Sequence, residues 1–281
     1  MLNLADWPLA DRRQLIGVFT DIDDTLTTEG AITPDALQAL SDLKAAGLHV
    51  IPITGRPIGW SEPFARGDIA RGLLPWPVDA IVAETGSAAV TLRKNGLQPS
   101  SDVREQLSKL YQMDATTRAK NFILMQAVAQ QVLREIPGAQ LAQDSPGRET
   151  DIAIDHSEFS HLSPEQIAQA VQIIQNAGMT ATVSSIHING WFGAHNKLVG
   201  ARWIVRELFG RDLDKERQRW AFVGDSTNDQ VMFEHFTHSV GVANVRRFEA
   251  KLAHLPRYIT HGARGAGFAE VAAAILQAHR A

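Results

Sequence analysis

A short apolar run that ends at once in polar residues occurs four times in this chain of 281 residues, and it constrains the fold most. Runs of this kind are typical of strands buried on both faces, as in parallel sheets covered by helices. The polar residues then fall at the carboxyl ends of the strands, where open α/β sheets form their sites. The four runs span residues 14–20, 48–53, 80–83 and 220–223.

Helices are predicted between these strands. One begins near Pro34, a proline suited to the first turn, and ends at Gly47 after leucines at helical spacing. Another is predicted over residues 198–208, and a further strand over residues 239–242. Strands and helices that alternate in this way predict an α/β fold with a Rossmann-like parallel sheet.

The middle of the chain has a different pattern. Residues 148–155 alternate like a half-exposed strand, and several further segments resemble antiparallel strands joined to helices. We therefore expect an α/β core formed by residues 1–88 and 191–281, with an inserted α+β domain at residues 89–190. The other predicted segments are a hairpin turn at 94–96, helices at 119–135 and 164–176, and a strand pair at 180–185 and 186–191.

Composition narrows the chemistry. The chain has no cysteine, which excludes disulfides, thiolate nucleophiles and cysteine-bound zinc or iron–sulfur clusters. Its 27 Lys and Arg against 31 Asp and Glu give a net charge of −4, which argues against a nucleic-acid-coating protein. The histidines are not grouped at metal-ligand spacing. Catalysis or metal binding must therefore use Asp, Glu, His, Lys, Ser or Thr.

The first acidic cluster, Asp21, Asp23 and Asp24, follows the first predicted strand. Carboxylates this close repel one another and need a cation, a shared proton or full solvation. A calcium loop of the EF-hand type does not fit, because Leu26 and Ile32 stand where that loop requires glycine and glutamate. A cation site and a solvated junction between strand and loop both remain open.

Three further clusters allow a functional and a structural interpretation. Thr54, Gly55 and Arg56 could hold a phosphate oxygen or form a turn. Lys197 stands just before an apolar helix, where lysines are usually exposed. The loop from Gly224 to Asp229 offers oxygen ligands for a hard cation, or an ordinary helix cap.

Together, in this order, the four clusters resemble the haloacid-dehalogenase-like (HAD) phosphohydrolase superfamily. The segments VFTDIDDTLT and GDSTND resemble its first and last motifs. The insertion lies between the Thr and Lys motifs, as in the large-cap, Cof-type subfamily IIB of sugar phosphatases and phosphomannomutases. One departure is Glu84, which stands before Thr85 and Gly86 where many relatives have asparagine.

The resemblance implies a role for each matching residue. It implies that Asp21 is the nucleophile that forms an aspartyl-phosphate and that Asp23 is the general acid/base. It implies that Thr54 and Lys197 bind the phosphoryl oxygens. It also implies a Mg²⁺ cofactor, held by Asp21, the carbonyl of Asp23 and Asp225, with support from Asp229 and Asn228.

The inserted domain would then be a cap that selects the substrate, a small phosphorylated metabolite such as a sugar phosphate. Candidate substrate-binding residues are Gly55 and Arg56 in the core and Arg148, His187 and Asn189 in the cap. A phosphohexomutase is an alternative, with Arg148 the clear candidate for a second phosphate. A non-catalytic sugar-phosphate-binding protein is another.

Location and partners follow from what the sequence lacks. No stretch approaches the ~20 apolar residues that span a bilayer, and the amino-terminal residues lack the apolar run of a signal peptide. We therefore expect a cytoplasmic protein, monomer or homodimer, with no nucleic-acid or membrane partner.

Overall fold

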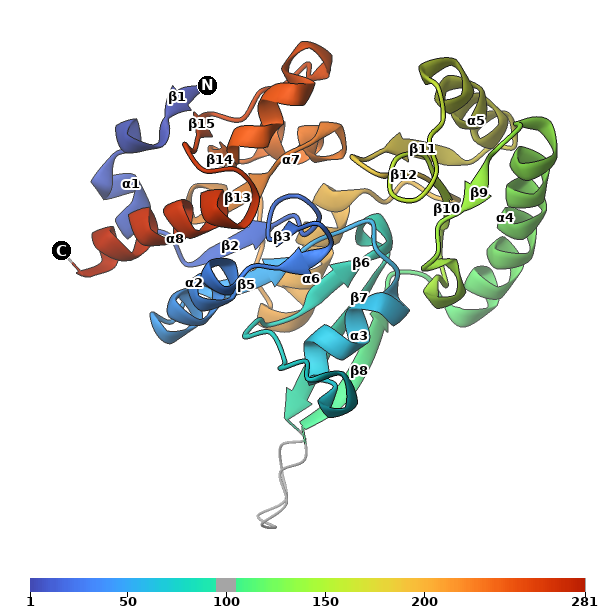
Figure 1. Ribbon diagram of the computed structural model, residues 1–281. Helices are drawn as coiled ribbons and strands as arrows, with labels where there is room; N and C mark the ends of the chain where they lie inside the picture. Colours follow the sequence, from blue (N-terminus) through green and yellow to red (C-terminus); the bar gives the residue numbers. More distant parts are fainter. Residues whose placement is uncertain (95–104, 281) are drawn as a thin grey trace.

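The computed structural model describes residues 1–94 and 105–280, which form two lobes (Figure 1). The larger lobe is the α/β core and contains both chain ends. The smaller lobe is an α+β cap formed by the middle of the chain. Asn95 and Gly96 of the predicted hairpin turn lie outside the described residues.

A six-stranded parallel sheet is the centre of the core. Its order is β1-β15-β14-β13-β2-β5, and every neighbouring pair runs parallel. This confirms the predicted α/β class. The strands are β1 (Leu2–Asn3), β15 (Tyr258–Ile259), β14 (His238–Gly241), β13 (Trp220–Gly224), β2 (Gly17–Thr20) and β5 (His49–Pro52).

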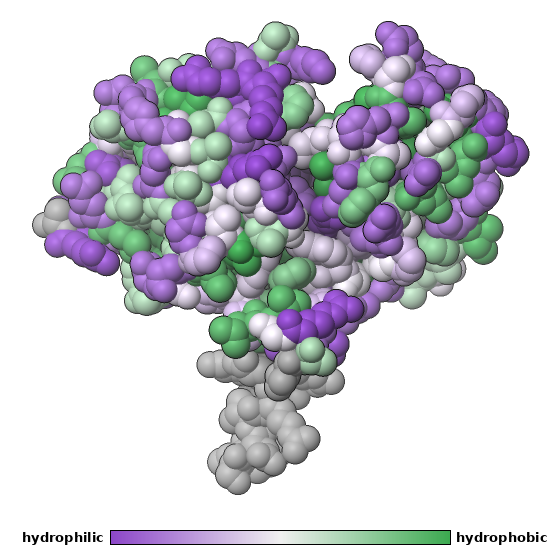
Figure 2. Space-filling view, in the orientation of Figure 1, coloured by the Kyte–Doolittle hydropathy of each residue, from purple (hydrophilic) through white to green (hydrophobic). Residues whose placement is uncertain are grey.

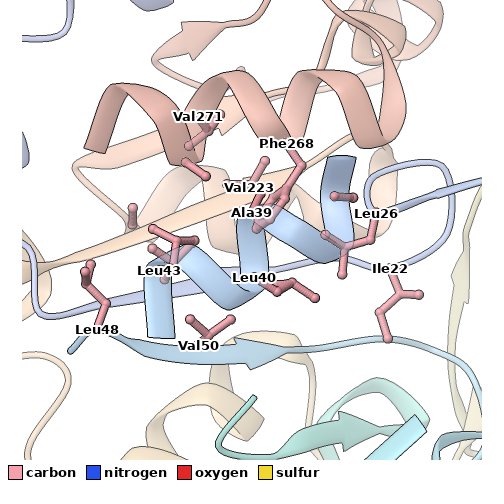
Figure 3. Packing of buried hydrophobic residues seen from close by; sticks show 14 of the residues in the cluster. Ile22, Leu26, Ala39, Leu40, Leu43, Leu48, Val50, Val223, Phe268 and Val271 are labelled. Atoms are coloured by element: carbon pink, nitrogen blue, oxygen red, sulfur yellow. The ribbon is translucent and has the colours of Figure 1, made fainter. Parts of the chain in front are cut away.

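Helices cover both faces of this sheet and bury two apolar clusters. On one face α2 (Pro34–Ala45) packs on α8 (Arg264–Arg280), and Leu40, Val50 and Phe268 interlock in that layer (Figure 3). The short helix α1 (Leu9–Arg13) packs beside α8. On the other face lie α6 (Lys197–Phe209) and α7 (Gln230–His235).

A hairpin extends the core beyond β5. Ile53 pairs with Val82 of β6 (Ile81–Ala83), which is followed by β7 (Ala88–Lys94) and β8 (Glu105–Tyr111). The helix α3 (Ile58–Arg66) covers this hairpin, and Ala88 and Val90 are buried in the core cluster. The predicted boundary at residue 89 therefore falls inside a strand that packs on the core rather than on the cap.

The cap is an antiparallel sheet in the order β11-β12-β10-β9, with two helices on one face. Its core lies between that sheet and α4 and α5. The bounds are β9 (Gln140–Leu141), β10 (Ile152–Asp155), β11 (Thr180–Val183), β12 (His187–Trp191), α4 (Ala115–Glu135) and α5 (Pro164–Asn176). Residues 148–151, predicted to begin a strand, instead form a docked segment before β10.

A small antiparallel hairpin, β3 (Thr27–Thr28) and β4 (Ala31–Ile32), follows the first acidic cluster and packs against α8. We call it the flap hairpin. Its turn requires left-handed backbone at Glu29 and Gly30, with φ of 52° and 78°. None of the helices in the described parts of the chain is long and apolar enough to cross a membrane.

Candidate active site

The predicted residues meet at one edge of the parallel sheet. Asp21 follows β2, Thr54 follows β5 and Asp225 follows β13, and these strands are direct neighbours in register. The amino-terminal end of α6 adds Lys197. Because parallel strands end together, four segments distant in sequence place their polar side chains in one small volume.

Lys197 connects the two acidic motifs. Its Nζ donates to Oδ1 of Asp21 and to Oδ1 of Asp229, each at 2.7 Å, and its side chain is fully buried. Burial lowers the pKa of Lys197, but the two carboxylates outweigh burial and raise it above its usual range. The side chain of Asn196 caps α6 by accepting from Val199, which fixes this end of the helix. Lys197 is therefore a fixed buried cation.

Asp21, Asp225 and Asp229 form a buried carboxylate group whose oxygens lie within 4.8 Å of one another. Burial raises the pKa of Asp21 to about 7; Lys197 opposes this shift, while Asp229 and Asp23 add to it. Burial and the neighbouring carboxylates likewise raise the pKa of Asp225 well above its usual value. Oδ1 of Asp225 is buried without a hydrogen-bond partner. A hard cation fits here, because it would satisfy this oxygen and offset the repulsion.

Asp229 and Asn244 position the second acidic loop. Oδ2 of Asp229 accepts from the backbone N–H of Asp225 at 2.9 Å and of Ser226 at 3.1 Å. The amide of Asn244 donates to Oδ2 of Asp225 and to the carbonyl of Asp24, each at 3.0 Å. The predicted ligand Asn228 instead accepts from the Ser226 hydroxyl at 2.9 Å. Asn244 is not among the predicted site residues, although the segment VGVANV that contains it overlaps a predicted strand and resembles the same subfamily.

Asp23 lies beside the buried group and is held by Arg56. The guanidinium donates to both oxygens of Asp23 at 2.9–3.1 Å. It also donates to Asp144 at 3.1 Å and to Glu158 at 2.7 Å, both in the cap. Arg56, predicted to bind substrate, is thus shared among three carboxylates. The Thr54 hydroxyl accepts from the backbone N–H of Arg56 and so fixes the turn.

The predicted cap residues Arg148, His187 and Asn189 are also engaged. Arg148 donates to the Gly55 carbonyl at 2.9 Å and to Asp151 at 2.8 Å, and Asn189 donates to the same two groups. The side chain of Arg148 is 1% exposed. Nε2 of His187 bonds the carboxylate of Glu158 at 2.8 Å. These contacts dock the cap on the active-site loop, and substrate binding by these residues stays a prediction.

Glu84, which departs from the expected asparagine, is a core-to-cap contact. It is fully buried, and its backbone has a φ of 47°. Its carboxylate accepts from the backbone N–H of Ile58 at 3.0 Å and of Glu149 at 3.1 Å, and from the hydroxyl of Thr150. Glutamate at this position therefore anchors the docked segment that precedes β10.

Two hollows that share Asp23, Arg56 and Ile186 in their linings lie between the core and the cap. Figure 2 shows the cleft between the two lobes. The inner pocket is small and is lined by Asp21, Thr54 and Asn228 from the core and by Ser184–His187 and Asn189 from the cap. The outer cavity, of about 490 Å³, lies between the flap hairpin and the cap. Asp23 and Arg56 line both, so the predicted acid/base stands between the small inner pocket and the larger outer cavity.

Comparison with protein-family models and with curated protein sequences gives no match. Solved structures do match. A sucrose-phosphatase from Synechocystis sp., solved with sucrose and phosphate, is 17% identical, with a TM-score of 0.63 over 94% of this chain and 98% of that one. A putative HAD/COF-like hydrolase from Plasmodium vivax is 14% identical, with a TM-score of 0.64 over 96% and 99%. The fold is that of the HAD hydrolases.

The HAD fold extends to the cap. A HAD subclass IIB sugar phosphatase is 15% identical, with a TM-score of 0.56 over 94% of this chain and 98% of that one. Because both chains are covered almost fully, the match includes the inserted domain as well as the parallel sheet. The resemblance drawn from the motifs is thus confirmed at the level of the fold.

Proposed function

We propose that this protein is a magnesium-dependent phosphomonoester hydrolase that acts on a small phosphorylated metabolite, a sugar phosphate. One observation carries the proposal: a buried lysine bridges Asp21 and Asp229 at 2.7 Å beside a third carboxylate. Such a group concentrates a nucleophile, a fixed cation and a cation-binding cluster at one point. The fold, shared with sugar phosphatases, supports the same reaction class.

The reaction would proceed in two displacements. A carboxylate oxygen of Asp21 attacks phosphorus, the bond between phosphorus and the ester oxygen breaks, and Asp23 gives its proton to the leaving alcohol. Water then attacks phosphorus and gives a proton to Asp23 while the bond between phosphorus and Asp21 breaks, so that inorganic phosphate leaves and the Asp21 carboxylate is restored. Lys197 and Thr54 hold the phosphoryl oxygens, where fixed positive charge and hydrogen bonds stabilise the transition state.

Asp21 and Asp225 would hold Mg²⁺, because their oxygens share the buried group and Asp225 has a free oxygen. The ion, when bound, would neutralise charge on the phosphate and on the carboxylates. Asp229 has a different role. Its two oxygens are engaged by Lys197 and by backbone N–H groups, so it supports the site from behind.

The test is hydrolysis of an aryl phosphate with Mg²⁺. We expect Asp21→Asn to lower kcat by about 1,000-fold or more, because no nucleophile remains, while far-UV circular dichroism stays unchanged. Asp35→Asn, on the exposed start of α2, is the matched control and should keep full activity. Turnover by Asp21→Asn that still depends on magnesium would refute the proposal.

A further inference from the structure

One cap loop is held rigidly over the outer cavity. The carboxylate of Asp155, at the end of β10, accepts from four successive backbone N–H groups. The bonds run from Ser157 at 3.1 Å, Glu158 at 2.9 Å, Phe159 at 2.8 Å and Ser160 at 3.1 Å. Asp155 itself is buried. The loop of residues 156–160, which we call the Asp155 loop, is therefore fixed in the structure rather than free to rearrange.

This loop places a carboxylate and an aromatic ring side by side on the outer cavity. Oε1 of Glu158 accepts from Arg56 at 2.7 Å, and Oε2 accepts from His187 at 2.8 Å. Burial would raise the pKa of Glu158, but the bonds from His187 and Arg56 outweigh it and lower the pKa to about 2. Glu158 is thus ionised. Its Oε2 also accepts from Arg56 at 3.4 Å, whereas Oε1 accepts one bond, from Arg56, and retains a lone pair that can accept from a ligand hydroxyl.

Phe159 supplies the apolar half of this surface. Its side chain is 61% exposed although the backbone beneath it is fixed, so its exposure comes from the position that the loop imposes. Small-molecule sites are lined mainly by apolar and aromatic side chains, so Phe159 at the edge of this cavity is suited to contact a ligand. A ring with an apolar face and with hydroxyl groups could pack its apolar face on Phe159 and donate a hydroxyl to Glu158.

The charges of the outer cavity are unbalanced toward the negative. Four carboxylates line it, those of Asp23, Asp24, Glu29 and Glu158, against the guanidinium groups of Arg56 and Arg264. Both guanidinium groups are already paired: Arg56 with three carboxylates, and Arg264 with Asp24 at 2.9 Å. Among the described residues that line this cavity, no cation is left for a second anionic group of the substrate.

We infer that the leaving group is an uncharged, hydroxylated ring, bound by Phe159 against its apolar face and by Glu158 at a hydroxyl, and that a second anion is rejected. This inference rests on the proposed function, because it concerns the alcohol released from the same phosphate site. It assigns the Asp155 loop as the specificity determinant. It also disfavours a bisphosphate intermediate, because Arg148, predicted for a second phosphate, is buried and paired.

Matched substrates test whether a second anionic group is rejected. Glucose 1-phosphate and glucuronic acid 1-phosphate are rings that differ in a hydroxymethyl group against a carboxylate, and glucose 6-phosphate and glucose 1,6-bisphosphate differ in a second phosphate. We expect kcat/KM, from phosphate release with Mg²⁺, to favour the member of each pair that has one anionic group at least about tenfold, because like charges in a confined site repel. Equal or reversed preference would overturn the inference.

Two variants test the residues. Glu158→Gln should reduce the preference for glucose 1-phosphate over glucuronic acid 1-phosphate about fivefold or more, because it removes the repelling charge. Phe159→Ala should raise KM for glucose 6-phosphate about fivefold more than it raises KM for acetyl phosphate, which has no ring. Glu135→Gln and Phe122→Ala on α4 are the matched controls, since both lie outside the two hollows.

Acetyl phosphate distinguishes a failure of the proposed function from a failure of the inference about the leaving group. If neither acetyl phosphate nor any sugar ester is hydrolysed with Mg²⁺, the proposed function fails and the inference fails with it. If acetyl phosphate is hydrolysed but the sugar esters with one anionic group are not preferred, only the inference fails. An unchanged ratio of KM values in Phe159→Ala would remove Phe159 from the recognition surface.

Discussion

At the scale of single residues, Lys197 is the buried cation that connects the two acidic motifs. It has no solvent contact, and its ammonium group offsets two buried carboxylates. A buried ion pair adds little net stability over an apolar pair, but removing one partner leaves an uncompensated buried charge. The cost of losing Lys197 should therefore exceed the strength of either bond.

We predict that Lys197→Met lowers the free energy of unfolding by about 3–5 kcal/mol near neutral pH without added metal. The loss should be smaller in mild acid, where the stranded carboxylates can take up a proton. Urea denaturation at the two pH values measures both effects. Lys215→Met, at a lysine whose side chain is 82% exposed, is the control and should change stability little. A loss for Lys197→Met no larger than the control would contradict the buried bridge.

The raised pKa of Asp21 predicts how the stability of the fold depends on pH and on Mg²⁺. Its pKa in the folded state is raised by burial from 3.8 to about 7, so between these values the folded protein holds a proton that the unfolded chain releases. In the absence of metal, this group therefore makes the fold less stable as pH rises through that window. Mg²⁺ requires the deprotonated carboxylate, so its stabilising effect should grow over the same range.

The measurement is the rise in Tm caused by millimolar MgCl₂. We expect a shift of several degrees at about pH 8 and little shift at about pH 5.5. Asp225→Asn removes an oxygen ligand and should abolish the shift at the higher pH. The same shift at both pH values, or a full shift in Asp225→Asn, would mean that Mg²⁺ binds elsewhere.

At the scale of elements, the position of α6 depends on two glycines. A Cβ on Gly200 would lie 2.5 Å from Cα of Gly86, so the helix and the loop after β6 touch through their backbones. Lys197 begins the same helix, three residues earlier. Alanine normally favours a helix interior, but here any side chain must push α6 away from the active-site edge.

We predict that Gly200→Ala lowers the free energy of unfolding by about 1–3 kcal/mol and also lowers kcat, because Lys197 moves with α6. Gly210→Ala, at the other end of α6, is the control: its φ is 63° and nothing lies within 4 Å. It should cost about 1 kcal/mol through backbone strain alone and leave kcat unchanged. Equal stability and equal kcat for the two variants would show that α6 has room to shift.

Element types were predictable where one segment carries its own pattern. The helix predicted over residues 164–176 matches α5, and the buried runs that end at Thr20 and Val223 match β2 and β13 within a few residues. The sequence pattern places most of β7 in the cap, because antiparallel strands are typical of the cap. The packing of Ala88 and Val90 in the core cluster shows that this strand belongs to the core, and a contact of this kind cannot be predicted from the strand's own residues. Residues 148–151 alternate like a strand, but contacts with Gly55 and Glu84 hold them as a docked segment.

At the scale of the whole molecule, the site is shared by two lobes, and contacts between lobes leave no pattern in the sequence. Asp21, Thr54, Lys197 and Asp225 could be placed together because parallel strands end at one edge. Asp144 and Glu158 carry no such signal, since each is an isolated acid in the cap that gains its role from Arg56, about 90–100 positions away in sequence. Long-range pairing of this kind is decided by tertiary structure alone.

The last prediction concerns closure of the cap. The hydroxyl of Thr227 in the core donates to the carbonyl of Val183 in the cap at 2.8 Å, and the adjacent residues Ser184, Ser226 and Asn228 line the inner pocket. Because this pocket is closed and narrow, a bulky ester should require the lobes to part before it can bind or leave.

The chain has no cysteine, so a cross-link between Val183→Cys and Thr227→Cys would be its only disulfide. We expect oxidation of the double variant to lower kcat/KM for a hexose phosphate at least about tenfold and dithiothreitol to restore it, with both single variants insensitive to oxidation. Full activity in the oxidised, cross-linked protein would show instead that substrate enters through the outer cavity while the cap stays closed.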